Sequence, residues 1–368
     1  MPRNKVLIAG ASGVVGNAAI EAFLGDEDWN VVALSRRAPS TAGGQVFEHL
    51  PLDLLDPDGC TATLRRHPDI THIVYAALFE KAGLVKGWRD EEQMQTNLAM
   101  LRNLLGALEA AGCQIEHFSL LQGTKAYGAH IHPIAVPARE SWRRDPHENF
   151  YWLQEDFLRE SSADRGFGFT IWRPQIVFGD VVGVAMNIIP VIGAYAALCR
   201  DEGLPLAFPG GPPTLLEAID ARLLGRALRW AAGAPSARNE TFNITNGDVF
   251  VWQNVWPSIA RTFGLEAAAG PRVKLGEYMP AKAEAWKRLA VRHGLAIDDL
   301  SALLGESHHY ADFTFGTYSR SETPPPVLVS TIKLRQAGFG DCIDTEVMFR
   351  DCFASLADRR IIPPLAVT

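Results

Sequence analysis

The sequence predicts an α/β protein with a doubly wound parallel sheet and a smaller C-terminal capping region. Short apolar stretches alternate with amphipathic segments from residue 5 to about residue 175. That alternation is typical of βαβ units whose sheet is covered by helices on both faces. Beyond about residue 180 the alternation weakens, and Pro- and Gly-rich stretches appear at residues 209–213 and 324–326. Such stretches mark loops or boundaries, so the second half is expected to be a separate cap.

The individual elements follow from local patterns along the chain. Amphipathic helices are expected over residues 14–24 and 91–111. In the second, Met94, Leu98 and Leu101 recur at steps of four and three, which places them on one face, and Gly112 ends the pattern. Apolar stretches typical of buried strands occupy residues 5–9, 30–34, 72–77, 117–121, 170–173 and 241–244.

Composition excludes several classes of protein. The 368 residues are 47% hydrophobic and 21% charged, which excludes a disordered chain. With 35 basic and 42 acidic residues and no basic tract, the chain is not expected to bind nucleic acid or an anionic membrane surface. The uncharged segment 181–199 contains Pro190 and two glycines, so we expect it to be buried or to line the substrate cavity rather than to span a membrane.

The five cysteines are odd in number and form no CxxC pair, which disfavours a disulfide scaffold or a thiolate zinc site. The first apolar run is short and is followed at once by glycines, unlike a secretory signal. We therefore expect a cytoplasmic protein with reduced thiols and no bound metal.

A GxxGxxG motif, formed by Gly10, Gly13 and Gly16, lies between the first predicted strand and helix. In a Rossmann dinucleotide site these glycines make the tight turn, let the backbone approach a pyrophosphate, and let helix and strand pack closely. The helix N-terminus adds free N–H groups. The alternative is a glycine-rich turn that binds nothing. The expected phosphate contacts are Gly10, Ser12, Gly13, Val14, Val15 and Gly16.

The end of the second predicted strand favours NADPH as the cofactor. An NAD site would place an acidic residue there, whereas this chain has Ser35, Arg36 and Arg37. Guanidinium groups match the geometry of a 2′-phosphate, although two solvated arginines are the alternative. Asp53 and Leu54 end a further apolar stretch, where the carboxylate is expected either to accept from the adenine amino group or to cap the local turn.

The predicted catalytic pair is Tyr151 and Lys125. Short-chain dehydrogenases pair a tyrosine with a lysine four residues later on the same helix face. Four residues after Tyr151 this chain has Glu155, which would oppose a tyrosinate. Lys125 follows the fourth predicted strand, where catalytic groups of parallel sheets gather.

With these residues in place, the chain resembles the progesterone 5β-reductase and iridoid synthase-like family of atypical extended short-chain dehydrogenases. The similarity spans nearly the whole chain, and the displaced lysine is its most distinctive mark. The resemblance implies NADPH-dependent reduction of enone and enal C=C bonds, with Tyr151 and Lys125 catalytic. The matching stretches are residues 10–16, 35–37, 123–127, 149–156, 173–179, 242–252 and 333–339.

Two departures limit what the resemblance transfers. Ala126 stands where the family has a histidine after the lysine, and Asp180 begins a stretch where the family has Phe-Ser-Pro. A steroid or iridoid preference is therefore not carried over. Further contacts with the cofactor are expected from Ala77, Gln122, Tyr151, Ile176, Ala185 and Met186.

The predicted function is NADPH-dependent reduction of an α,β-unsaturated carbonyl compound, a small-molecule substrate. The alternatives are an extended short-chain carbonyl reductase or epimerase, and a non-enzymatic NADP(H)-sensing regulator. The expected division assigns residues 1–178 and 215–250 to the NADP-binding Rossmann domain, and residues 179–214 and 251–368 to the substrate-capping region. A homodimer is possible from the resemblance, since the family contains dimers.

Overall fold

The computed structural model describes residues 4–40, 46–81, 90–317 and 324–366. The chain divides into two compact units. The first unit comprises residues 1–175, 221–245 and 329–341, and the second comprises residues 176–220, 246–328 and 342–368. These are six alternating segments, so the chain passes from one unit to the other five times.

A seven-stranded parallel sheet forms the centre of the first unit, in the order β10-β6-β5-β4-β1-β2-β3. The strand order reverses between β1 and β4, which is the point where dinucleotides bind in doubly wound sheets. The Rossmann sheet predicted from the sequence is confirmed. Its strands are β1 (Asn4–Ala9), β2 (Trp29–Leu34), β3 (Glu48–Leu50), β4 (His72–Tyr75), β5 (His117–Leu121), β6 (Gly168–Pro174) and β10 (Glu240–Ile244).

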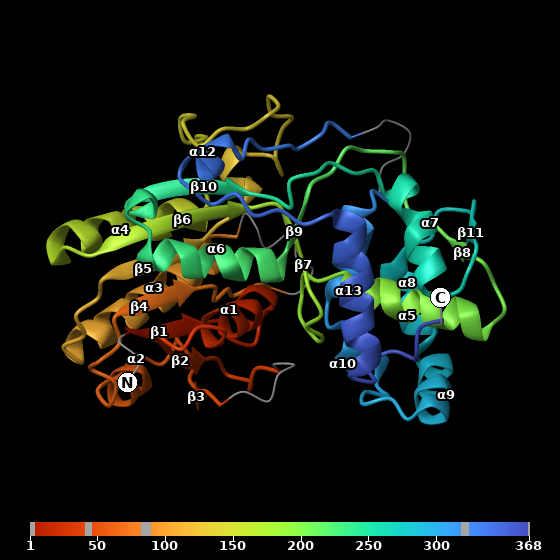
Figure 1. Ribbon diagram of the computed structural model, residues 1–368, viewed down its shortest axis with the longest axis horizontal. Helices are drawn as coiled ribbons and strands as arrows, with labels where there is room; N and C mark the ends of the chain where they lie inside the picture. The colour runs from red at the N-terminus through yellow and green to blue at the C-terminus, as the bar shows by residue number, and fades with distance from the viewer. Residues whose placement is uncertain (1–3, 41–45, 82–89, 318–323, 367–368) are drawn as a thin grey trace. The chain divides into compact units, whose positions relative to one another are not determined.

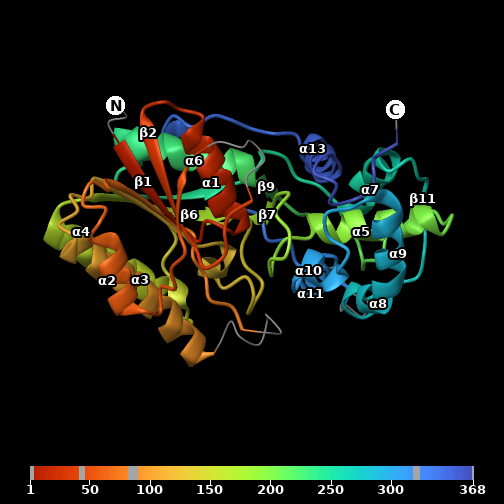
Figure 2. The ribbon, with the colours of Figure 1, turned by 90° about the horizontal axis from the view of Figure 1, so that it is seen from below.

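Helices cover both faces of this sheet (Figure 2). One face carries α1 (Val14–Leu24) and α6 (Ala221–Gly233), which pack against each other. The other carries α2 (Pro57–Leu64), α3 (Glu91–Ala110) and α4 (Phe150–Arg165). The strands are consequently buried on both sides, and β4 and β6 are buried at every residue.

Helices α3 and α4 are each capped at the N-terminus by a side-chain oxygen. The Asp90 carboxylate accepts from the Gln93 N–H at the start of α3, and the Asn149 side chain accepts from the Tyr151 N–H at the start of α4. Such caps satisfy N–H groups that have no partner within the helix. Gly166 ends α4 in the left-handed conformation.

Helices dominate the second unit (Figure 1). The segment 181–199 leads into α5, which is buried on nearly every side, as expected. In the part of the chain that the structure describes, no helix is long and apolar enough to cross a membrane. The helices are α5 (Ile189–Asp201), α7 (Trp252–Thr262), α8 (Leu275–Ala281), α9 (Ala283–His293), α10 (Leu300–Leu304), α11 (Ser307–Thr314) and α13 (Thr345–Asp358).

Two small parallel sheets complete the second unit. One pairs β7 (Ile176–Phe178) with β9 (Ala218–Asp220), and the other pairs β8 (Leu206–Ala207) with β11 (Ala267–Ala268). The core beside α5 is rich in aromatic rings, and Trp252 meets Phe315 edge to face with ring centroids 4.9 Å apart.

Residues 329–341 fall in the first unit, whereas the predicted division placed them with the cap. In this segment α12 (Ile332–Gln336) packs against β10. The Asn243 side-chain amide donates to the carbonyls of Ala138 and Ser330, at 3.2 and 3.1 Å, and so anchors the segment. The proline run at residues 324–326 indicated a boundary, but no local pattern indicated that the chain returns to β10.

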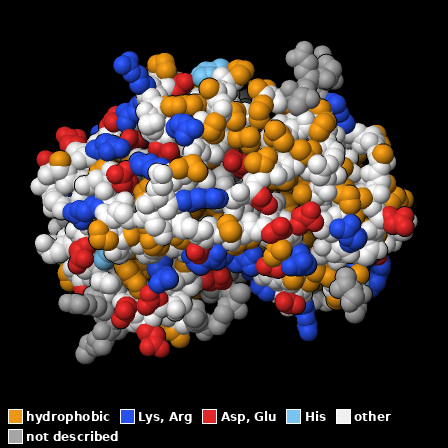
Figure 3. Space-filling model, turned by 45° about the horizontal axis from the view of Figure 1, so that its top comes forward, with side chains coloured by type: hydrophobic (Ala, Val, Ile, Leu, Met, Phe, Trp, Pro, Cys, Tyr) orange, Lys and Arg blue, Asp and Glu red, His pale blue; other side chains and the backbone are white. Residues whose placement is uncertain are grey.

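Figure 3 shows basic and acidic side chains close together over the left and lower parts of one face, whereas hydrophobic side chains gather over its upper part. This mixture reflects the composition of 35 basic and 42 acidic residues.

Candidate active site

The glycine motif forms the turn between β1 and α1, and its geometry explains two of the three glycines. Gly10 has a φ of +84°, and a Cβ there would lie 2.6 Å from backbone atoms of Ala76 and Ala77. A Cβ on Gly16 would overlap the Gly10 carbonyl oxygen. A side chain at Gly10 would therefore push the turn away from the backbone that follows β4, and one at Gly16 would push α1 away from the turn. Ala77, one of the expected cofactor contacts, lies against this turn.

Helix α1 begins at Val14 with Gly13 as its N-cap residue, and no side chain caps it. Its first turn contains no acidic residue. The backbone N–H groups of the first turn therefore remain available to an anion, which the positive end of the helix dipole also favours. The expected phosphate contacts, from Gly10 to Gly16, all lie on this turn or in the first turn of the helix.

Ser35, Arg36 and Arg37 form a turn after β2. The Ser35 hydroxyl donates to the Arg37 carbonyl at 2.6 Å, which fixes the backbone between them. The Arg36 side chain is 70% exposed, and its Nη1 lies 4.0 Å from the Asp53 carboxylate. Arg36 therefore presents an exposed guanidinium group just after the end of β2.

Asp53 and Leu54 make local contacts. Asp53 Oδ1 accepts from the Leu55 N–H at 3.0 Å, which is the turn-capping role that the sequence left open. The Leu54 side chain is buried in the core, and its carbonyl accepts from Asn103 at 2.7 Å. Ile176, Ala185 and Met186, also expected at the cofactor, belong to the second unit.

Tyr151 lies in the first turn of α4, with 8% of its surface exposed. A Cβ on Gly123, directly after β5, would lie 3.2 Å from the Tyr151 hydroxyl oxygen. The phenol is therefore close to the backbone at the carboxyl end of β5. Lys125 lies two residues further on, in the short 3₁₀ helix η2 (Thr124–Tyr127).

Lys125 is partly buried, and burial lowers the pKa of its ammonium group to about 8, against the attraction of Glu80. Glu80 follows β4 and accepts a hydrogen bond from the Gln93 side-chain amide at 3.1 Å. The Gln93 side-chain oxygen Oε1 in turn accepts from the Lys81 backbone N–H at 2.9 Å, which ties this segment to α3. A lysine that titrates near neutral pH is typical of functional sites.

Glu155 occupies the position where the usual catalytic lysine would stand, and it is 5% exposed. Its carboxylate accepts from Gln122 at 3.0 Å. Three guanidinium groups surround it, at 2.9, 3.4 and 3.7 Å, from Arg159, Arg144 and Arg173 respectively. This buried carboxylate is therefore compensated by neighbouring charges and has a structural role.

Gln122 was expected to contact the cofactor, yet its side chain is already engaged with protein groups. It donates to the Tyr151 carbonyl at 3.2 Å and to Glu155, and it accepts from Arg173 Nε at 3.1 Å. In this arrangement Gln122 links the end of β5 to the turn of α4 that carries Tyr151.

Tyr127 is the other tyrosine in this region, and its hydroxyl donates to Asn243 Oδ1 at 2.6 Å. Its burial raises the pKa of that phenol. The Tyr127 hydroxyl is therefore committed to a buried partner.

Glu80 and Asn149 also belong to this region, although neither was predicted as a site residue. Asn149 followed by an apolar helical run is a recognisable N-cap signal, so its capping role was available from the sequence. Glu80 gave no such signal, because the residues that surround it come from α3 and η2.

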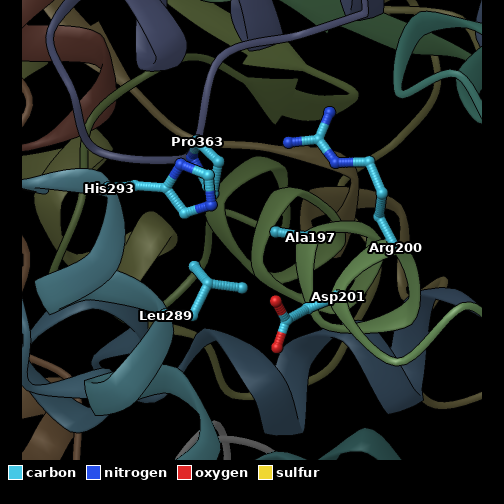
Figure 4. Close-up of a pocket in the computed structure, with 6 residues that line it drawn as sticks. All are labelled: Ala197, Arg200, Asp201, Leu289, His293 and Pro363. Carbon is cyan, nitrogen blue, oxygen red and sulfur yellow. The ribbon is translucent and has the colours of Figure 1, made fainter.

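The second unit contains a pocket of about 200 Å³ between α5, α9 and the segment near Pro363 (Figure 4). It is smaller than the 300–1,000 Å³ typical of ligand sites. Of its lining residues, Ala197 belongs to the segment 181–199 that was expected to be buried or to line the substrate cavity, and Asp201 is ion-paired with Arg292. The lining consists of Ala197, Arg200, Asp201, Leu289, His293 and Pro363.

Comparison with known proteins identifies similar sequences. A profile described as the PRISE-like Rossmann-fold domain matches residues 6–315. The (S)-8-oxocitronellyl enol synthase of Nepeta cataria is 32% identical over 319 residues, covering 81% of each chain. The 3-oxo-Delta(4,5)-steroid 5-beta-reductase of Arabidopsis thaliana is 31% identical over 306 residues, covering 78% of this chain and 77% of the relative.

Solved structures share the fold at lower sequence identity. The UDP-glucose 4-epimerase of Thermotoga maritima, solved with UDP-glucose, has a TM-score of 0.66 at 13% identity and covers 96% of this chain and 99% of its own. The Thermus thermophilus enzyme of that name, solved with NAD, has a TM-score of 0.65 at 17% identity, with coverage of 95% and 99%.

Proposed function

Because the chain belongs to the PRISE-like Rossmann-fold family, we propose that it uses NADPH to reduce the C=C bond of α,β-unsaturated carbonyl compounds. It is an oxidoreductase of the short-chain dehydrogenase/reductase type. One observation carries the proposal: the Tyr151 hydroxyl lies near Gly123 at the end of β5, and Lys125, rather than residue 155, supplies the amine of that region.

The residues at the ends of β1 and β2 fit NADPH. The turn that Gly10 and Gly16 keep narrow, together with the uncapped start of α1, suits a pyrophosphate. The exposed guanidinium of Arg36 and the neighbouring Arg37 suit a 2′-phosphate. When bound, NADPH would supply the hydride that reaches the β-carbon of the substrate.

Tyr151 is assigned to the carbonyl oxygen of the substrate. As the β-carbon is reduced, negative charge develops on that oxygen, and a hydrogen bond from the phenol stabilises it. One well-placed donor of this kind contributes roughly 3 kcal/mol to the transition state. The α-carbon then takes its proton from water, so no second acid is required.

Lys125 is assigned to the same developing charge. Its ammonium group strengthens the field at the phenol and at the carbonyl oxygen when it is protonated. Since the pKa of Lys125 is about 8, the charged form predominates at neutral pH and diminishes in mildly alkaline solution. Glu155 cannot replace it, because that side chain is negative and is held by arginines.

The relatives support a conjugated carbonyl as the substrate class, since the name of the Arabidopsis relative describes a 3-oxo-Delta(4,5)-steroid reductase. We propose a small-molecule enone or enal for this chain, without choosing between steroid and terpenoid carbon skeletons. Asp180, where the sequence departs from the family pattern, accepts hydrogen bonds from Ser355 and Arg359 within the second unit.

Product analysis with 2-cyclohexenone and NADPH tests the proposal. A saturated ketone is the expected product. An allylic alcohol would instead indicate a carbonyl reductase, and NADPH binding without any product from a panel of enones and enals would indicate a sensor. Tyr151→Phe is the matched negative control, with Tyr127→Phe as the tyrosine variant expected to remain active.

A further inference from the structure

We propose that Asp145 and His147 are positioning residues for the catalytic pair: they fix the Asn149 side-chain amide, which ties the backbone of Lys125 to that of Tyr151. This inference rests on the proposed function, because it assumes that Lys125 and Tyr151 act together. It concerns a loop histidine and a carboxylate that neither the glycine motif nor the tyrosine motif includes.

Asn149 bridges two stretches of chain that carry the proposed catalytic groups. Its Oδ1 accepts from the Tyr151 N–H at 3.0 Å. Its Nδ2 donates to the Lys125 carbonyl oxygen at 3.4 Å. The side chain is 6% exposed, so these hydrogen bonds are largely protected from water. The amide works in one orientation, since a flipped amide would place its NH₂ group against the Tyr151 N–H.

His147 holds that orientation. Asn149 Nδ2 lies 3.1 Å from His147 Nε2, and a donor at Nδ2 requires a lone pair at Nε2. The other ring nitrogen, Nδ1, lies 2.6 Å from Asp145 Oδ1. Because a carboxylate only accepts, the proton belongs on Nδ1, which leaves Nε2 as the acceptor. Asp145 thus selects the histidine tautomer that fits Asn149.

The surroundings hold the imidazole ring in place. The ring of His147 meets those of His130 and Trp152 edge to face, with centroids 5.1 and 6.1 Å apart. The His147 side chain is 10% exposed. Burial opposes ionisation of Asp145, but hydrogen bonds from His147 and His132 hold the pKa of that carboxyl below its usual range. The carboxylate is therefore ionised at neutral pH and available to orient the ring.

His132 provides a matched control on the same carboxylate. Its Nε2 lies 2.9 Å from Asp145 Oδ2, and its Nδ1 faces the Pro133 carbonyl oxygen at 3.0 Å. The His132 side chain is 47% exposed. Both histidines contact Asp145, but the second ring nitrogen of His132 faces Pro133, whereas that of His147 faces Asn149. Removing the His132 ring should therefore leave the bridge between Lys125 and Tyr151 intact.

Three variants, His147→Leu, His147→Gln and His132→Leu, test the proposal. His147→Leu is expected to lower kcat for 2-cyclohexenone roughly ten-fold with KM and NADPH affinity nearly unchanged, in line with losses at residues that orient catalytic groups. His147→Gln keeps an acceptor for Asn149 Nδ2, so it should restore most of kcat. His132→Leu should match the original protein.

Hydrogen–deuterium exchange of the unliganded protein gives a readout that needs no substrate. His147→Leu should speed exchange at the start of α4, while His147→Gln and His132→Leu should not. Unchanged exchange and kcat in His147→Leu would overturn the inference, as would equal losses in His147→Leu and His132→Leu. If His147→Leu does not fold, His147→Phe keeps a ring against His130 and Trp152 and should show the same loss.

The two proposals fail in different ways. If the unmodified protein reduces no enone, the proposed function fails, while the exchange measurement still decides whether His147 orders the start of α4. If the protein reduces enones but His147→Leu leaves both readouts unchanged, the proposed function stands and the positioning role is wrong.

Discussion

Glu155 and Lys125 are two ionisable side chains of the first unit whose charges the fold treats differently. Around the Glu155 carboxylate the fold places Arg144, Arg159 and Arg173, and Gln122 donates a further hydrogen bond. Around Lys125 burial outweighs the attraction of Glu80, so the pKa of the ammonium group falls to about 8. The Glu155 carboxylate thus has several partners of opposite charge, whereas burial destabilises the charged form of Lys125.

This difference distinguishes a charge that stabilises the fold, on Glu155, from a charge that we propose acts on the substrate, on Lys125. A buried ion with several well-placed partners is costly to disturb. A buried ion with weaker compensation titrates within reach of neutral pH, which is useful for catalysis. We propose that the helix position that usually carries a lysine has a structural role here, and that the amine comes from Lys125 in η2.

The largest effect is expected from Glu155→Lys, which would restore the usual spacing of tyrosine and lysine. The new ammonium would face three guanidinium groups, so the free energy of unfolding should fall by roughly 3–5 kcal/mol. Urea denaturation measures it, with Glu160→Lys on the exposed side of α4 as the control. A stable and more active Glu155→Lys protein would contradict the structural role of Glu155.

Tyr151→Phe should lower kcat by roughly a hundred-fold or more, corresponding to about 3 kcal/mol of lost charge stabilisation. NADPH affinity, measured by fluorescence titration, should be nearly unchanged. Tyr127→Phe removes a hydroxyl that is bonded to Asn243, so its melting temperature should drop while kcat stays close to the original. Equal kcat values for the two variants would remove Tyr151 from the mechanism.

Arg36 and Arg37 differ from Glu155 and Lys125 because their proposed role is to bind the cofactor from the end of β2. Replacing both arginines by serine tests that role. NADPH affinity should fall about ten-fold or more, since a charge-assisted hydrogen bond contributes roughly 1.5–3 kcal/mol. NADH affinity should not change. The matched control replaces the exposed Arg65 and Arg66 by serine, which removes the same charge elsewhere on the surface. If NADPH and NADH raise the melting temperature of the original protein equally, the assignment of NADPH is wrong.

The smallest effect concerns Glu80→Gln. If protonated Lys125 is the active form, kcat should decline as the pH rises through about 8. Removing the Glu80 charge lowers the pKa of Lys125 further, so this alkaline limb should move to lower pH by up to about one unit. Glu92→Gln, at the exposed start of α3, should leave the limb in place. A pH–rate profile that does not move in Glu80→Gln would exclude Glu80 as the residue that tunes Lys125.

Local patterns in the sequence were sufficient for most of the Rossmann sheet. The glycines at 10, 13 and 16 and the periodicity of residues 91–111 each depend on neighbours a few positions apart, which is what sequence patterns record. The short strand β3 and the return of residues 329–341 were missed. Both depend on pairing or packing with distant elements, β2 for the first and β10 for the second.

The residues of the proposed site likewise fall into those that local sequence patterns predicted and those that they did not. Tyr151, Lys125 and the absence of lysine at residue 155 were read from spacing and resemblance, and their roles remain predictions. The arginines around Glu155 come from α4, β6 and the loop before α4, and Glu80 reaches the site from the loop after β4. No local spacing brings such residues together, so their grouping became visible with the fold.

The repeated passage of the chain between its two units has a practical consequence for dissecting the protein. A fragment that stops at residue 175 would lack α6 and β10, which belong to the same unit as β1. Strand β6 would then become an unprotected sheet edge, and such edges promote aggregation. Deletion of residues 176–220 alone would keep α6 and β10 but would remove α5 from the core of the second unit, whose residues 246–328 and 342–368 would remain in the chain.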